Sequence, residues 1–319
     1  SMIKNDPTNR FYDNTMLSTY KECPRKYMLR HILGWRGTGT SNALIFGLSW
    51  HSAMDAIWIN AKQLANDRKE LLHQGLLGFL ATWTEQGMPA QPDIEQLEHL
   101  GLRNPMTAQD MLKHYIDTRW SILQEAELLA VEQPFAVPVP QMTNTWYIGR
   151  LDKVIKLNET LTVEHKTTTE YKKDGGFKSS YVESWYSDSQ VKGYEFGGGL
   201  FFPNHSQVWV DAALVHKTVH NAFRFIPVAH QMPLLEEWIG DTREWVMRVG
   251  QDTALMGSKS VAFPKNEGSC MGKYGPCTFL NICRTTPDPT QLDGPPEGYI
   301  EEFWKPFDLL NLDKIMDKE

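Results

Sequence analysis

Three short segments between Pro134 and Lys166 do most to decide what this chain can fold into. Residues 135–139, 145–156 and 160–166 are rich in β-branched and aromatic side chains, and Asn158-Glu159 between the last two suits a hairpin turn. They follow a stretch, residues 40–131, in which apolar residues recur at helical spacing. Strands in succession after one helical segment and before others predict an α/β protein.

The remaining segments are predicted from the same patterns. We expect helices over 15–32 with a break near Pro24, over 46–71, over 106–131 with Thr107 as its cap, over 187–194 closed by three glycines at 197–199, and over 233–256. Further strands are expected near 207–217 and 222–229. Residues 1–319 then form one elaborated domain, with a helical segment over 40–131, a core sheet within 132–232 and a C-terminal extension over 285–319.

Composition narrows the class of protein. The net charge of -7 excludes a protein that holds nucleic acid by a general excess of positive charge, although a local basic groove stays possible. No window reaches 18 uninterrupted apolar residues, and no basic segment with an apolar run opens the chain. We therefore expect an intracellular, cytoplasmic protein with no membrane partner. No P-loop motif occurs, so a nucleoside triphosphate is not expected as a partner.

Two carboxylates and a lysine fall on the last two predicted strands. Side chains alternate along a strand, so Glu164 and Lys166 project from one face, and a hairpin would bring Asp152 to that face from the neighbouring strand. Carboxylate oxygens suit Mg²⁺ or Mn²⁺, and a nearby lysine can orient water or offset charge on a phosphate. The alternative is an exposed strand face with cross-strand ion pairs.

Other polar residues add to this set. His51 follows Phe46-Gly47-Leu48-Ser49-Trp50 near the start of a helix, and imidazole is a good ligand for Mn²⁺. Gln190 and Tyr194 are four residues apart, which places them on one face of the helix that follows. They could contact a phosphate or a base, or could simply form a helix surface.

The four cysteines form a distinctive pattern. Cys270, Cys277 and Cys283 lie close together among turn-forming residues, whereas Cys23 stands far upstream before Pro24. Four thiolates supply the coordination that an iron-sulfur cluster or a structural zinc ion requires. Four unrelated buried thiols are the alternative.

In their joint order these features resemble the iron-sulfur-containing, RecB-like branch of the PD-(D/E)XK nuclease superfamily. That branch includes AddB-type and CRISPR-adaptation exonucleases and phage-encoded relatives. The resemblance runs from about Leu17 to Cys283. It is carried by the residues Cys23, His51, Glu132, Asp152, Glu164, Lys166, Gln190, Tyr194, Cys270, Cys277 and Cys283. One departure is the six residues between Cys270 and Cys277, where several relatives have two.

The resemblance implies a restriction-endonuclease-like core: a central mixed β-sheet flanked by helices, with a helical insertion and an iron-sulfur region formed by residues 15–32 and 264–284. His51, Asp152, Glu164 and the main-chain carbonyl of His165 would hold Mg²⁺ or Mn²⁺, with Glu132 near the metal. Lys166 would be the catalytic lysine, and Gln190 and Tyr194 would contact DNA. The four cysteines, Cys23, Cys270, Cys277 and Cys283, would ligate a 4Fe-4S cluster, with zinc as the alternative.

The activity implied is that of a metal-dependent DNA exonuclease acting on single strands or DNA ends in recombination, repair or phage replication. Its partner would be DNA, with a second copy of the chain or a recombination protein as further possibilities. Two other functions stay open from the sequence. One is a structure-specific endonuclease or resolvase, and the other is a non-catalytic DNA-binding module with a structural metal site.

Overall fold

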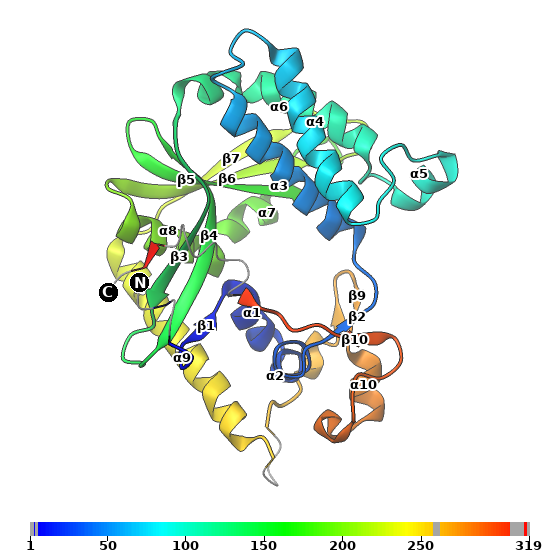
Figure 1. Cartoon of the computed structure of the whole chain (residues 1–319), viewed down its shortest axis with the longest axis vertical. Coiled ribbons are helices and arrows are strands. Elements are labelled where there is room, and N and C mark those ends of the chain that lie inside the picture. Colours follow the sequence, from blue (N-terminus) through cyan, green and yellow to red (C-terminus); the bar gives the residue numbers. More distant parts are fainter. Residues whose placement is uncertain (1–2, 4–5, 258–261, 307–315, 318–319) are drawn as a thin grey trace. The chain divides into compact units, whose positions relative to one another are not determined.

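The computed structural model describes Ile3 and residues 6–257, 262–306 and 316–317 of the 319-residue chain. The chain forms two units, each assembled from separate stretches of sequence. Residues 1–39, 134–150 and 232–319 form the first unit, and residues 40–133 and 151–231 form the second. The strands β3 (Glu127–Pro138) and β4 (Thr145–Lys156) contribute to both (Figure 1). The expected single domain stays a prediction.

The first unit holds both cysteine-bearing segments. Its other elements are β1 (Arg10–Tyr12), α1 (Asn14–Glu22), α2 (Pro24–Tyr27), the π-helix η2 (Met28–Ile32), β2 (Trp35–Gly37), α9 (Met232–Leu255), η4 (Glu267–Ser269), β8 (Met271–Gly272), β9 (Gly275–Pro276), α10 (Leu280–Thr285), η5 (Pro289–Gln291), β10 (Tyr299–Glu301) and β11 (Met316–Asp317). The break predicted near Pro24 is confirmed, because Cys23 is extended and Pro24 opens α2, where its missing N–H costs no hydrogen bond. Tyr20 on α1 donates a 2.6 Å hydrogen bond to Asp252 on α9, which ties these helices together.

The second unit contains a mixed sheet. Residues 153–156 of β4 pair antiparallel with β5 (Thr160–Thr168), β5 pairs in parallel with β6 (His205–Leu214), and β6 pairs antiparallel with β7 (Phe223–Val228). The hairpin between β4 and β5 that the sequence predicted is therefore present. Both flanks of β5 are paired, which leaves its side chains to define two faces of the sheet.

The second unit also contains several helices. They are α3 (Asn42–Asn60), α4 (Arg68–Glu85), α5 (Ile94–Leu100), α6 (Pro105–Glu125), α7 (Ser179–Ser184), the 3₁₀ turn η3 (Trp185–Ser187) and α8 (Ser189–Phe201). Helices α3, α4 and α6 pack together, and α3 also packs on β5 (Figure 1). Their shared core includes Phe46, Phe79 and Leu112, all fully buried, together with Val163 from β5. This packing holds α3 against the sheet.

Several predicted helix boundaries differ from those in the structure. The helix expected over 46–71 is two helices, because Asn60 ends α3 and the side chain of Asp67 caps a new helix at the Glu70 N–H. The helix expected over 106–131 begins at Pro105 after an Asn104 cap, rather than at Thr107, and ends at Glu125, so residues 127–131 belong to β3.

The three glycines at 197–199 do not end their helix, since α8 continues to Phe201. A Cβ on Gly198 would lie 2.4 Å from Nε2 of His205, so the glycine allows close packing of α8 against β6 instead of terminating α8. Part of the C-terminal extension, residues 299–301, pairs antiparallel with β2, whereas residues 307–315 and 318–319 lie outside the described residues.

Within the described part of the chain, no helix combines the length and the apolar character needed to cross a membrane.

Candidate active site

The site begins where β4 and β5 separate. Their last paired residues are Lys153 and Val163, so Asp152 and Glu164 follow directly on either side of the opening. Both carboxylates are buried, at 5% and 2% exposure. One oxygen of Asp152 accepts a 2.9 Å hydrogen bond from the main-chain N–H of His165, which fixes that carboxylate against β5.

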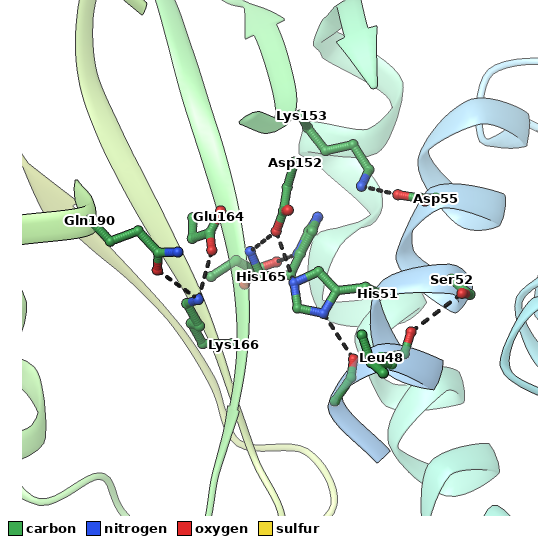
Figure 2. A network of polar contacts seen from close by, with 12 residues as sticks. Leu48, His51, Ser52, Asp55, Asp152, Lys153, Glu164, His165, Lys166 and Gln190 are labelled. Carbon is green, nitrogen blue, oxygen red and sulfur yellow. Dashed lines mark hydrogen bonds and ion pairs between the residues drawn. The ribbon is translucent and has the colours of Figure 1, made fainter. Parts of the chain in front are cut away.

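His51 reaches this opening from helix α3. The helix is capped by the Ser41 side chain, and His51 lies two and a half turns along it. Nδ1 of His51 lies 2.8 Å from the carbonyl oxygen of Gly47, which can only accept a hydrogen bond, so Nδ1 carries the proton. Nε2 therefore faces the carboxylates and lies 3.0 Å from Asp152 (Figure 2).

Lys166 lies on the other side of Glu164. Its Nζ is 2.7 Å from Oε1 of Glu164 and donates a 3.1 Å hydrogen bond to Oε1 of Gln190 on α8 (Figure 2). The strand thus presents Glu164 and Lys166 together, as their spacing predicted, and α8 supplies the amide that holds the lysine. The Lys166 side chain is 26% exposed, so its ammonium can be approached from solvent.

The charges of these groups depend strongly on one another. Burial and the neighbouring Asp152 raise the pKa of Glu164 to about 7. Burial opposes charge on His51, but Asp152 outweighs it and raises the pKa of His51 to about 9. For Lys166, burial likewise opposes the charge, and the carboxylates of Glu164 and Asp152 still raise its pKa. Two carboxylates crowded in this way favour binding of an additional positive charge.

A divalent cation fits this arrangement. Ligand atoms of His51, Asp152 and Glu164 all lie within 4.8 Å of one another. Oε2 of Glu164 is buried and has no hydrogen-bond partner, an arrangement that costs free energy unless something binds the oxygen. An imidazole nitrogen with carboxylate oxygens suits Mn²⁺ or Mg²⁺.

Behind the site lies a buried network that the sequence reading missed. Asp211 on β6 accepts hydrogen bonds from Tyr115 at 2.6 Å and Arg119 at 2.8 Å, and its other neighbour is Nδ1 of His165 at 3.2 Å. Trp58 in turn donates to the Tyr115 hydroxyl at 3.0 Å. A charged residue inside the apolar strand segment Val-Trp-Val-Asp-Ala-Ala-Leu was the available signal.

A second missed contact joins α3 to β4. The side chain of Lys153 is fully buried and pairs with Asp55, one helical turn beyond His51 (Figure 2). Because this pair binds the helix to the strand, it restrains His51 relative to Asp152. A lysine inside an apolar strand was again the sequence signal.

Two residues named from the sequence lie less centrally. Glu132 is on β3 with a positive φ of 49° and is not part of the group of ligand atoms within 4.8 Å. Tyr194 lies one turn beyond Gln190 on α8 and is only 6% exposed. Their roles, and that of the His165 carbonyl as a ligand, stay predictions.

The four cysteines line one pocket in the first unit. Cys23, Cys270, Cys277 and Cys283 are all free thiols and share this pocket with the side chains of Lys26 and Lys265. The N–H of Cys277 donates to the carbonyl of Cys270 at 2.8 Å and closes the β8–β9 hairpin, which contains the six intervening residues.

The spacing of these sulfurs bears on what could bind there. Among the described residues, no three sulfurs lie within 4.8 Å of one another, because the His51 group alone meets that criterion. Tetrahedral zinc with bonds of about 2.3 Å would draw its sulfurs to about 3.8 Å apart. The described sulfurs do not show this close arrangement. Burial raises the pKa of Cys283, and the lysine at 265 opposes that shift.

The comparisons with known proteins identify the family of the chain. The family model of the PD-(D/E)XK nuclease superfamily matches residues 14–284. The chain belongs to the PD-(D/E)XK nuclease superfamily and has its α/β fold with a mixed central sheet flanked by helices. No curated protein sequence matches the chain.

Solved structures with some likeness include nucleases. A protein from Eubacterium rectale assigned as an exonuclease has a TM-score of 0.48 and 13% identity, covering 88% of this chain and 90% of that chain. The alkaline exonuclease LHK-Exo from Laribacter hongkongensis has a TM-score of 0.30 and 11% identity, covering 66% and 93%. LHK-Exo in complex with dAMP has a TM-score of 0.28 and 12% identity, covering 69% and 97%. Similarities at this level say nothing about the substrate.

Proposed function

We propose that this protein is a metal-dependent deoxyribonuclease, an exonuclease that hydrolyses phosphodiester bonds of single-stranded DNA or at DNA ends. Membership of the nuclease superfamily supports the class of reaction. The processes to which such an activity belongs are recombination, repair and phage replication. DNA is then the partner, and the protein works inside the cell.

One observation carries the proposal. The unpartnered, buried Oε2 of Glu164 lies in a group with His51 and Asp152, beside the ammonium of Lys166. Carboxylates at this depth are costly unless a cation compensates them. The presence of Asp152, Glu164 and Lys166 together favours catalysis over a non-catalytic module.

The chain's own residues then have distinct tasks. His51, Asp152 and Glu164, with the carbonyl of His165, would hold Mg²⁺ or Mn²⁺, which polarises a phosphate and lowers the pKa of water when bound. Lys166 directs its ammonium at the attacking oxygen or at charge developing on the phosphate. Gln190 keeps that ammonium oriented, because its amide oxygen accepts a hydrogen bond from Nζ of Lys166.

Replacing either member of the central pair tests this assignment. Glu164→Ala removes a ligand and Lys166→Ala removes the positioned ammonium, so each should lower cleavage of end-labelled DNA in Mg²⁺ or Mn²⁺ by at least about 100-fold. Glu159→Ala, in the exposed turn between the same strands, is the matched control and should retain activity. Full activity in either site variant contradicts the proposed centre.

The form of the substrate separates an exonuclease from an endonuclease. Linear and circular DNA, each single- and double-stranded, are incubated with the protein and Mg²⁺ or Mn²⁺. Cleavage from ends alone agrees with the proposal. Cleavage of circles would instead indicate an endonuclease or resolvase, and no cleavage a binding module.

We further propose that the cysteine pocket holds a 4Fe-4S cluster with a structural role. Four thiols that line one pocket provide the ligands, and the resemblance of the sequence to iron-sulfur nucleases supports a cluster. Ligation would join Cys23 to Cys270 across a long loop of chain and so restrain the unfolded state. Lys26 and Lys265 would offset the negative charge of the thiolates.

A further inference from the structure

A row of aromatic side chains leads away from Lys166. The ring of Trp185 has its centroid 5.9 Å from Nζ of Lys166. Tyr181 meets Trp185 edge to face at 5.7 Å, and Phe177 stacks on Tyr181 at 6.1 Å. All three rings are half-buried, so they line the surface beside the site without being part of the closed core. Nothing in the proposed chemistry uses them.

The turn that carries Trp185 is held by hydrogen bonds between Glu195, His230 and Tyr186. Glu195 on α8 accepts hydrogen bonds from the N–H of His230 at 2.7 Å and faces its Nδ1 at 2.6 Å. Nε2 of His230 lies 2.8 Å from the carbonyl oxygen of Tyr186, which can only accept, so this nitrogen donates. These hydrogen bonds fix the main chain of η3 and thereby the position of the Trp185 ring.

We propose that Trp185, supported by Tyr181, forms a nucleobase-binding subsite of the active centre, which stacks an unpaired base of the strand being cleaved. The inference rests on the proposed function and extends it to the choice of substrate. A base and its phosphate are separated by one sugar, so a phosphate that meets Lys166 brings a base of the same or the adjoining nucleotide within reach of Trp185.

Stacking explains how this surface can bind DNA without a basic excess. Residues 169–188 contain three lysines, at 172, 173 and 178, against four acids, at 170, 174, 183 and 188, so attraction of phosphates alone would be weak. Stacking on an aromatic ring tolerates any base, because every base has a π-face. A paired base is already stacked in its duplex and would first have to be extruded, so the subsite favours single strands.

An abasic substrate tests the subsite directly. Short single-stranded oligonucleotides are compared with the same oligonucleotides in which the terminal nucleotides at both ends are abasic. Binding is measured by fluorescence anisotropy in Ca²⁺ and cleavage in Mg²⁺. We expect the wild type to bind the intact strand about 5- to 150-fold more tightly than the abasic strand. Trp185→Ala should lose this preference and bind the two strands equally.

Two further variants serve as controls for a general effect of the substitution on the fold. Trp185→Phe keeps an aromatic face and should retain part of the preference. Trp120→Ala removes another half-buried tryptophan, on α6, and should keep all of it. A wild-type preference retained by Trp185→Ala, or an equal loss of binding for both strands, overturns the proposal. If the wild type binds intact strands preferentially but cleaves none, the nuclease proposal fails and the subsite stands.

Discussion

At the scale of single residues, the candidate site depends on buried charges that are matched in pairs. Asp211 is 2% exposed and accepts hydrogen bonds from Arg119 and Tyr115. It also lies beside Nδ1 of His165. The main-chain N–H of His165 in turn holds Asp152. Removing a residue that hydrogen-bonds to a metal ligand commonly weakens metal binding about 10- to 100-fold. Asp211 is therefore expected to act as a positioning residue.

Asp211→Asn tests this role. It leaves Arg119 buried without its counter-charge, so we expect a loss of about 3–5 kcal/mol in the free energy of unfolding, measured in urea. Mn²⁺ binding, followed by the electron paramagnetic resonance of the free ion, should weaken about 10- to 100-fold. Asp117→Asn is the control, because it breaks an exposed ion pair with Arg68 and should change stability by less than about 1 kcal/mol. Unchanged Mn²⁺ binding in Asp211→Asn would contradict the positioning role.

One histidine, His205, should make the stability of the folded protein depend on pH. Burial lowers the pKa of His205 from an ordinary value of 6.5 to about 4, so folding favours its neutral form. The stabilisation is complete above pH 6.5 and is lost as the pH falls towards 4, with a total of about 3 kcal/mol. His205→Gln keeps a group that can bond to Thr162 but cannot become charged. The unfolding free energy of this variant should fall less than that of the wild type between pH 7 and 4, and parallel curves would refute the assignment.

The sequence anticipated the residues that carry the chemistry better than those that support them. Glu164 and Lys166 could be paired because strand alternation is local, and Asp152 followed from one predicted hairpin. Asp211 and Arg119 meet only when α6 lies against β6, a contact that no local pattern encodes. Trp185 was one of eleven tryptophans, with nothing in its spacing to separate it from core residues.

At the scale of elements, helix α8 shows how close packing positions the site. The helix supplies Gln190 at one end, and Gly198 further along it lies against His205 of β6. Read locally, three consecutive glycines indicated the end of a helix. The structure keeps them helical because one of them admits the imidazole, a tertiary reason that outweighs their low helix propensity.

Gly198→Ala and Gly199→Ala form a matched pair that tests this packing. The new methyl at 198 would lie 2.4 Å from a ring nitrogen of His205, so the imidazole must move and stability should fall by about 1–3 kcal/mol. At 199 no atom lies within 4 Å, and alanine should stabilise the helix by about 0.5–1 kcal/mol. Thermal unfolding of the two variants measures the difference. Equal effects at both positions would show that the packing does not require a glycine.

Element boundaries were the weakest part of the sequence reading, and their errors share a cause. The break between α3 and α4 is set by an Asp67 cap within a polar stretch that otherwise continues the helical pattern. The strand β3 starts at Glu127, just before the apolar run 128–131, which fits a helix or a strand equally well. The strands β4 and β5 were located closely because a polar turn separates them.

At the scale of the whole molecule, the chain joins a nuclease site to a cysteine pocket, and each can be tested without the other. The site residues belong to the second unit and the cysteines to the first. The order of the four cysteines along the sequence was informative, because the family resemblance uses Cys23 together with Cys270, Cys277 and Cys283. The sequence left the nature of the bound group open, and the 4Fe-4S cluster in the cysteine pocket stays a proposal.

Cys277→Ala tests the cluster. We expect protein purified without oxygen to be brown with absorption near about 400 nm, and the variant to lose this absorption together with its iron. The melting temperature should fall, since a structural metal group contributes folding free energy. A colourless wild type that contains zinc and no iron would contradict the cluster and leave the nuclease assignment intact.

Anomalous scattering from crystals grown with Mn²⁺ tests directly whether a divalent cation binds between β4, β5 and α3. We expect a manganese peak within coordination distance of His51 Nε2, the carboxylates of Asp152 and Glu164, and the His165 carbonyl. A map with no peak among these atoms, at Mn²⁺ concentrations that support cleavage, would contradict the proposed cation site.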